Sequence, residues 1–175
     1  MSFQAHESPA AGKATLLSEA TRERIDHWLT KFPNGPEGRR SAVIQSLVAA
    51  QEQNQGWLSG DLMDAVADYL QVPPVWVYEV ATFYSMLETE PVGRHSISIC
   101  TNISCMLCGA DKVVDYVEHK LGIKMGQSTP DGKFFLKIEE ECVAACTGAP
   151  MMIINGHYHE RLTEDKIDRL LDGLE

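Results

Sequence analysis

In the first half of the chain, apolar residues recur with the period of an amphipathic helix. Ser18 can cap the first helix, whose inward positions at i, i+3, i+4 and i+7 are Ile25, Trp28, Leu29 and Phe32. Glycine and proline residues between positions 33 and 38 end this helix. A second helix is predicted from Ser41 to Gln55, because Gly56 then stops the pattern.

Two more helices are predicted before residue 90. Ser59 can cap the third, and Pro73–Pro74 suits the first turn of the fourth. Residues 75–80 alone could form a strand. A helix is favoured, because helical spacing is followed by Trp76, Val80, Phe83, Tyr84 and Leu87. We therefore expect a helical bundle over residues 18–90, preceded by a mobile polar tail over residues 1–17.

From residue 91 the apolar pattern changes to the alternation of strands. Residues 96–99 read as a half-buried strand that ends at the first cysteine. Residues 133–138 are a second strand, and it leads into a second loop that contains cysteine. Residues 151–154 are a third strand, which Asn155–Gly156 turns into a short fourth.

Two helices accompany these strands. Residues 110–121 form one, closed by Gly122, and Thr163 caps the last helix, whose inward residues are Ile167, Leu170, Leu171 and Leu174. The order strand, helix, two strands, helix predicts a small sheet with helices packed on it over residues 91–175. The predicted class is α+β, with an N-terminal helical bundle and a C-terminal thioredoxin-like domain. Both cysteine loops then fall at one edge of the sheet.

Composition and charge exclude several classes of function. The 175 residues are 44% apolar and 23% charged, which is typical of a globular protein. A net charge of −10 repels nucleic acid and anionic lipid. No apolar stretch approaches the roughly 18 residues of a membrane span, and the N-terminal residues lack the pattern of a signal or transit peptide. We expect a protein of the bacterial cytosol.

The five cysteines lie within the C-terminal half, and none occurs among the first 99 residues. Clustered thiols in a reducing compartment are more often metal ligands or redox groups than disulfides. Cys100 and Cys105 form a C-x4-C pair, and Cys142 and Cys146 form a C-x3-C pair. Four thiolates suit zinc or a [2Fe-2S] cluster, and zinc usually prefers the tighter C-x2-C spacing. The spacing therefore favours [2Fe-2S].

Other interpretations of the cysteines stay open. Cys105 and Cys108 form a C-x-x-C before a helix, where a thiol oxidoreductase would have a lowered thiol pKa. The same residues with Cys100 also match the C-x4-C-x2-C opening of plant-type ferredoxins, which would recruit Cys108 as a ligand. A zinc-stabilised interaction module is the third possibility. Haem attachment is excluded because Gly109, not histidine, follows Cys108.

Three smaller features complete the candidate chemistry. The chain contains neither G-x-G-x-x-G nor G-x-x-x-x-G-K-[ST], so it has no recognisable phosphate-binding loop for NADH or flavin. His157 and His159 flank a hairpin tip on one strand face, where a surface position is more common than a metal site. Pro150 is a candidate for a cis peptide bond, because related layer folds place a turn proline there.

Several segments are similar to one known family: GRRSAVI (38–44), AQEQN (50–54), GWLS (56–59), VYEVATFYSM (77–86), CTNISCMLCGA (100–110) and CVAACTGAPM (142–151). Together they resemble the small [2Fe-2S] subunit of the NADH dehydrogenase module of respiratory complex I, the proton-pumping NADH:quinone oxidoreductase. The resemblance runs from about residue 22 to residue 174. Free thioredoxin-like ferredoxins share only the cysteine half, so the helical half is what points to the subunit.

The resemblance implies that Cys100, Cys105, Cys142 and Cys146 hold one [2Fe-2S] cluster and that Cys108 is a bystander. The family usually has another residue at Cys108 and often Leu-Gly at Val143–Ala144. It also implies docking onto the flavin- and NADH-binding subunit, beside other peripheral-arm subunits, with no catalysis by the isolated chain and no insertion into the membrane. The equivalent subunit of an NAD-linked hydrogenase or formate dehydrogenase is the alternative.

Overall fold

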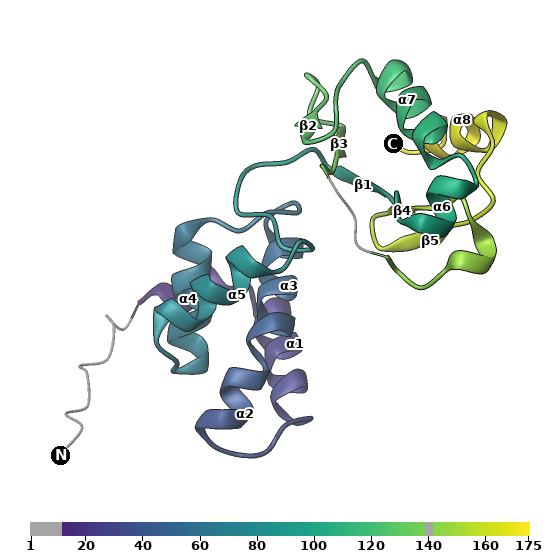
Figure 1. Cartoon of the computed structure of the whole chain (residues 1–175). Coiled ribbons are helices and arrows are strands. Elements are labelled where there is room, and N and C mark those ends of the chain that lie inside the picture. Colours follow the sequence, from purple (N-terminus) through teal and green to yellow (C-terminus); the bar gives the residue numbers. More distant parts are fainter. Residues whose placement is uncertain (1–11, 139–141) are drawn as a thin grey trace. The chain divides into compact units, whose positions relative to one another are not determined.

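A computed structural model describes residues 12–138 and 142–175 (Figure 1). The chain divides after Pro91 into two compact units, and the hydrophobic period changes at the same point in the sequence. The described helices do not include one that is both long enough and apolar enough to cross a bilayer.

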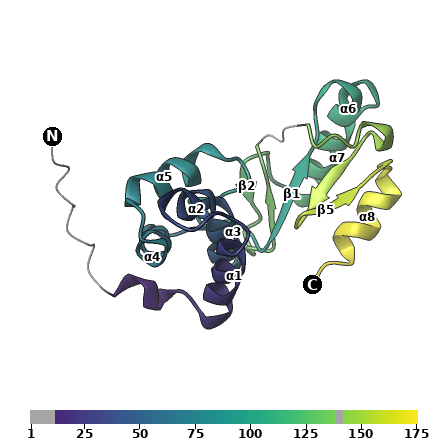
Figure 2. The ribbon, with the colours of Figure 1, turned by 90° about the horizontal axis from the view of Figure 1, so that it is seen from below.

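The N-terminal unit is entirely helical. Ser18 and Ser59 cap helices as predicted, because their side chains accept hydrogen bonds from the backbone N–H groups of Thr21 and Leu62. The elements, visible in Figures 1 and 2, are η1 (Lys13–Leu16), α1 (Glu19–Leu29), α2 (Pro36–Ser41), α3 (Val43–Gln53), α4 (Gly60–Leu70) and α5 (Pro74–Phe83).

Helix α2 forms in a segment where the glycines and prolines predict only an interruption. Pro36 occupies the first turn, where its missing N–H costs nothing. Gly38 is buried and lies so close to Pro33 that a β-carbon there would be 1.8 Å from the Pro33 carbonyl oxygen. The proline and the glycine therefore allow a short, tightly packed helix.

Helix α5 confirms the predicted helix after Pro73, but its buried face differs from the prediction. The helix ends at Phe83, and its fully buried residues are Val77 and Ala81. Trp76 and Val80 are partly buried against the core. The spacing predicts that Phe83 faces inward, yet 79% of its surface is exposed. The apolar spacing predicts the helix correctly and the orientation of its last turn incorrectly.

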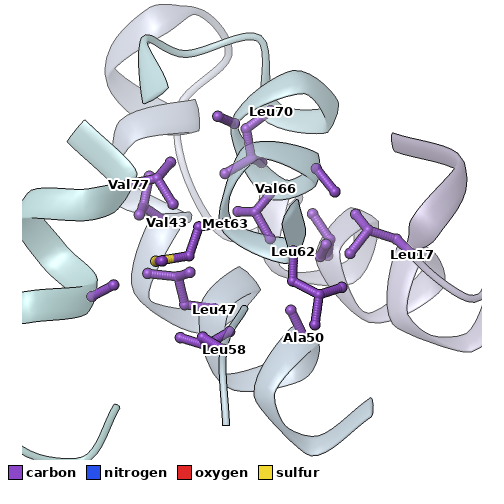
Figure 3. Close-up of a cluster of buried hydrophobic side chains, with 14 of the residues drawn as sticks. Leu17, Val43, Leu47, Ala50, Leu58, Leu62, Met63, Val66, Leu70 and Val77 are labelled. Atoms are coloured by element: carbon purple, nitrogen blue, oxygen red, sulfur yellow. The ribbon is translucent and has the colours of Figure 1, made fainter. Parts of the chain in front are cut away.

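The core of the helical unit is built from aliphatic side chains of every long helix (Figure 3). Leu47 of α3 and Val66 of α4 lie at its centre, and both are completely buried. Leu58, between these helices, is also completely buried. Burial of each such side chain stabilises the fold by about 1.5–3 kcal/mol.

The predicted mobile tail does not extend to residue 17. Residues 12–17 contain η1, and Leu17 is only 1% exposed in the helical core. Lys13 Nζ lies 3.0 Å from Asp61 Oδ1 and 2.7 Å from Asp64 Oδ2, both on α4. The burial of Leu17 holds this segment against the core. The burial could not be predicted from the hydrophobic pattern, because a single apolar residue shows no period. Residues 1–11 of the predicted tail lie outside the described residues.

Leu17→Ala is expected to destabilise the helical unit by about 2 kcal/mol, the lower end of the range for buried leucine. All three tryptophans, Trp28, Trp57 and Trp76, belong to this unit, so urea unfolding followed by tryptophan fluorescence reports on it alone. Leu16→Ala is the matched control, because Leu16 is 48% exposed and its loss should shift the urea midpoint little. Equal shifts for both variants would contradict the docking of Leu17.

The C-terminal unit is a mixed five-stranded sheet in the order β2-β3-β1-β4-β5. Its central strand β1 pairs parallel with β3 and antiparallel with β4, with Ile97 opposite Leu136 and Ile154 respectively. This confirms the α+β, thioredoxin-like class. The strands are β1 (His95–Ile99), β2 (Gln127–Ser128), β3 (Phe134–Leu136), β4 (Met152–Ile154) and β5 (His157–His159).

Helices α7 (Ala110–Leu121) and α8 (Glu164–Asp172) pack on this sheet and lie against each other. Lys120 Nζ of α7 is 2.9 Å from carboxylate oxygens of both Asp168 and Asp172 on α8. The shared core consists of Ile97, Ile99, Val113, Val117, Leu136, Met152, Ile154, Ile167 and Leu171, with smaller contributions from their neighbours. The ends of both helices are as predicted, with Gly122 in a left-handed conformation and Thr163 as a cap.

Local turns of this unit also follow the sequence. Asn155 and Gly156 both have positive φ, 49° and 81°, as the two-residue hairpin turn requires. The peptide bond between Ala149 and Pro150, the candidate position for a cis bond, is cis. The sequence pattern does not predict the five-residue helix α6 (Ile103–Leu107), which lies between the first cysteines.

Candidate functional site

The first pair of cysteines is held inside the C-terminal unit. Cys100 follows directly after β1, and its backbone N–H donates to the Met151 carbonyl over 3.2 Å. Cys105 lies in α6 and is only 2% exposed, beside Cys100, which is 3% exposed. Ala110 and Met151 complete this small buried cluster. The end of the central strand therefore brings both thiols to one place.

Burial raises the pKa of the Cys105 thiol to about 11, and a hydrogen bond with the Cys100 side chain and the nearby Cys146 thiol act in the same direction. A backbone hydrogen bond from Met151 acts in the opposite direction, since it stabilises the thiolate. The protonated thiol is favoured unless a cation replaces the proton. The raised pKa disfavours a free thiolate at Cys105.

The second pair lies on a surface loop. Cys142 and Cys146 are exposed, and their Sγ atoms are 3.8 Å apart. Cys146 begins the 3-10 turn η2 (Cys146–Gly148). Between the two cysteines, Ala144 has a φ of 57°, the left-handed region that glycine occupies most easily. The loop thus folds back on itself and directs both thiols to one side.

The two loops are neighbours. Val143, Ala145 and Ala149 of the second loop pack against the buried cluster that contains Cys100 and Cys105. In the described part of the chain, no group of three or more His, Cys, Asp or Glu side chains is arranged to hold one metal ion. The four thiols therefore form two neighbouring pairs, one buried and one exposed.

Two hydrogen-bond donors to the sulfurs are not evident from the sequence. Asn102 Nδ2 lies 3.8 Å from Cys100 Sγ, and the Met151 backbone donates to Cys105. From the sequence, this role is expected of backbone N–H groups of residues 101–107 and 143–148. An Asn two residues after a cysteine is a weak signal that could have indicated the first donor. Met151 becomes visible only through the pairing of β1 with the chain leading into β4.

The thioredoxin-like [2Fe-2S] ferredoxin family model matches residues 25–175. The chain belongs to this family. The match includes α2 to α5 as well as the cysteine-bearing unit. Of the metals that the cysteine spacing left open, membership in this family implies a [2Fe-2S] cluster.

Relatives of this ferredoxin cover most of its length. It is 42% identical over 152 residues to the E 2 subunit of the NADH-quinone oxidoreductase of Rhizobium meliloti (strain 1021), and the match covers 87% of each chain. It is 45% identical over 144 residues to the E subunit of the NADH-quinone oxidoreductase of Rickettsia felis, covering 82% of this chain and 84% of the relative.

The fold is shared with solved structures of an NAD+-reducing hydrogenase. An NAD+-reducing [NiFe]-hydrogenase in the air-oxidised state matches with a TM-score of 0.61 and 24% sequence identity. The matched region is 72% of this chain and 22% of that chain, so this ferredoxin spans about a fifth of the hydrogenase chain. The similarity shows a shared fold.

The structure does not favour the ferredoxin as a thiol oxidoreductase. Such an enzyme needs an accessible thiol with a lowered pKa, whereas Cys105 is buried and its pKa is raised. Cys108 is exposed at the end of α6 and lines a separate pocket of about 450 Å³ together with Lys112 and Tyr116. The exposure of Cys108 contrasts with the burial of Cys105, one helical turn earlier.

His157 and His159 both lie on the short strand β5. His157 is exposed, and partial burial together with the charge of Lys166 lowers the pKa of His159. The positive charge of Lys166 disfavours a second positive charge on His159. Within the described ranges, these histidines belong to no group of three side chains that could hold a metal ion. The surface position predicted for both histidines agrees with the exposure of His157, whereas His159 is partly buried.

Proposed function

We propose that this ferredoxin is the E subunit of NADH-quinone oxidoreductase and holds one [2Fe-2S] cluster through Cys100, Cys105, Cys142 and Cys146. The observation that carries the proposal is the placement of two thiol pairs on adjacent loops of a [2Fe-2S] ferredoxin fold. In such clusters each iron takes two thiolates. The relatives that support the assembly carry this name and match over more than four fifths of the chain.

In this proposal each pair has its own part in holding the cluster. Cys100 and Cys105 bind from the buried side, where Asn102 and the Met151 backbone donate hydrogen bonds to the sulfurs. Cys142 and Cys146 bind from the exposed side. When bound, a [2Fe-2S] cluster accepts and releases one electron. Hydrogen bonds to the sulfurs raise its potential, and the net charge of −10 lowers it.

The proposed electron partner is the flavin- and NADH-binding subunit of the same enzyme. This chain has no glycine-rich dinucleotide or phosphate motif, so hydride chemistry belongs on another subunit. The chain would then lie at the cytoplasmic face of the inner membrane, attached through the complex and without direct insertion. The acidic charge supports a protein partner over a lipid one.

The alternative assembly is an NAD-linked hydrogenase or formate dehydrogenase. The shared fold with the NAD+-reducing hydrogenase supports it, but at 24% identity against 42–45% for the oxidoreductase subunits. Both assemblies require the same cluster. Isolation of the native chain with its partners distinguishes the two assemblies, since only the NADH-quinone oxidoreductase contains quinone-linked subunits.

The cluster is tested by analysis of anaerobically purified full-length chain. About two irons and two acid-labile sulfides per chain, with a paramagnetic signal after dithionite reduction, are expected for one [2Fe-2S] cluster. One zinc per chain without sulfide would contradict the proposal and support an interaction module. A chain without metal but with a redox-active disulfide would support the thiol oxidoreductase.

A further inference from the structure

The helical unit exposes a group of large apolar side chains just where α5 ends. Phe83 is 79% exposed, Met86 48% and Tyr84 38%. All five residues from 82 to 86 are exposed, and the rings of Phe83 and Tyr84 meet edge to face with centroids 5.1 Å apart. We call Phe83, Tyr84 and Met86 the apolar ledge. Grouped exposed apolar residues typically mark a binding surface.

The backbone under the ledge is held in place. The Gln51 side chain donates to the Met86 carbonyl over 3.1 Å and accepts from the Glu88 N–H over 2.7 Å. The Glu88 carbonyl accepts from the Leu58 N–H over 2.7 Å, and Leu87 is buried. The ledge is thus presented by an ordered segment. Pre-organised aromatic side chains lose little conformational entropy on binding, so they are effective anchors.

The charge around the ledge selects the kind of partner. Residues 41–93 contain no Lys or Arg but seven carboxylates: Glu52, Asp61, Asp64, Asp68, Glu79, Glu88 and Glu90. Lys13 pairs with Asp61 and Asp64, and Arg24 pairs with Glu52. Glu79, one helical turn before Phe83, and Glu90 are exposed. Arg40 of α2 lies over the Trp76 ring of α5, which places one cation against the helix that carries Phe83. The exposed carboxylates nearest to the ledge in sequence, Glu79 and Glu90, disfavour nucleic acid and anionic lipid and favour a basic protein surface.

We propose that the apolar ledge binds an apolar pocket, rimmed by Lys or Arg side chains, on another protein subunit of the same enzyme. The proposal rests on the proposed function, because it requires that the chain be part of a multi-subunit enzyme.

The test replaces the native copy, in the organism that encodes it, by tagged full-length chains. The NADH-quinone oxidoreductase is purified by its NADH-oxidising activity, and peptide mass spectrometry measures the tagged chain relative to the other subunits. The double variant Phe83→Ser, Met86→Ser is expected to be retained at least about tenfold less than the unsubstituted chain. Leu16→Ser is the matched control, because Leu16 is 48% exposed, like Met86, and lies outside the ledge.

Charge is tested separately. Glu79→Lys should lower retention several-fold at low salt, because it places a cation against the proposed basic rim. High salt should weaken the retention of the unsubstituted chain. Retention of Glu79→Lys at the level of the unsubstituted chain would overturn the basic rim.

Two readouts separate failure of this proposal from failure of the proposed function. The purified double variant should keep its iron, its sulfide and its urea midpoint, since the ledge residues are not part of the core of the helical unit and the cysteines belong to the other unit. If it were retained like the unsubstituted chain, the ledge proposal would be overturned while the function stood. If the unsubstituted chain were absent from the enzyme, both would fail. Should the double variant unfold, Phe83→Ala carries the same test with the same criterion.

Discussion

Cys146→Ser is expected to abolish binding of the [2Fe-2S] cluster, whereas Cys108→Ser should leave it intact. Cys146 belongs to the exposed pair, 3.8 Å from Cys142 Sγ, and its thiol is near enough to buried Cys105 to contribute to the raised pKa of that residue. Serine oxygen is a harder ligand than thiolate and loses its proton less readily. Outer-shell changes lower metal affinity by about 10–100-fold, and loss of a ligand should exceed that range.

Iron, sulfide and the paramagnetic signal of the reduced chain are the measurements. Cys108→Ser is the matched control, because it removes an exposed thiol of the same unit that belongs to neither pair. The opposite outcome, in which Cys108→Ser loses the cluster and Cys146→Ser keeps it, would support the plant-type C-x4-C-x2-C ligand set. Loss in both variants would indicate that all five thiols contribute.

Gly38→Ala is expected to destabilise the helical unit by about 3 kcal/mol, the upper end of the range for overpacking. The added β-carbon would lie 1.8 Å from the carbonyl oxygen and 2.9 Å from the carbonyl carbon of Pro33. Both are backbone atoms, so the methyl group can be accommodated only if α2 moves away from the preceding turn. Urea unfolding followed by tryptophan fluorescence measures the effect in this unit.

Gly60→Ala is the control for this prediction. Gly60 also lies in a helix of the same unit, but the nearest atom to an added β-carbon is the Tyr78 hydroxyl at 3.4 Å. Alanine also has the higher helix propensity, so the variant should be neutral or slightly more stable. Similar losses for Gly38→Ala and Gly60→Ala would show that the contact with Pro33 is not the cause.

Features of the fold that depend on neighbouring residues could be predicted from the sequence. Ser59 and Thr163 cap helices because a side-chain oxygen reaches an N–H only three residues ahead. Gly122 and Asn155–Gly156 take positive φ because the turns there require it. The two short helices α2 and α6 were missed because five or six residues complete little more than one turn, too few to show a period.

The candidate site could be predicted only as a set of residues. The spacing of the cysteines and the family segments identified Cys100, Cys105, Cys142 and Cys146 as candidate ligands, and that set stays a prediction. The burial of one pair and the exposure of the other could not be predicted, because each depends on packing across the sheet. The same holds for the contribution of Met151 to Cys105.

The sequence by itself determined the kind of chemistry and the order of the elements. Thiol spacing, helix caps and hydrophobic period are local properties, and a chain carries them before it folds. Only the tertiary structure decided that Leu17 belongs to the core, that Phe83 faces outward and that two cysteine loops more than 30 residues apart in sequence lie together. These outcomes depend on which surfaces of distant segments meet, and that is settled by packing of the whole unit and not by any one segment.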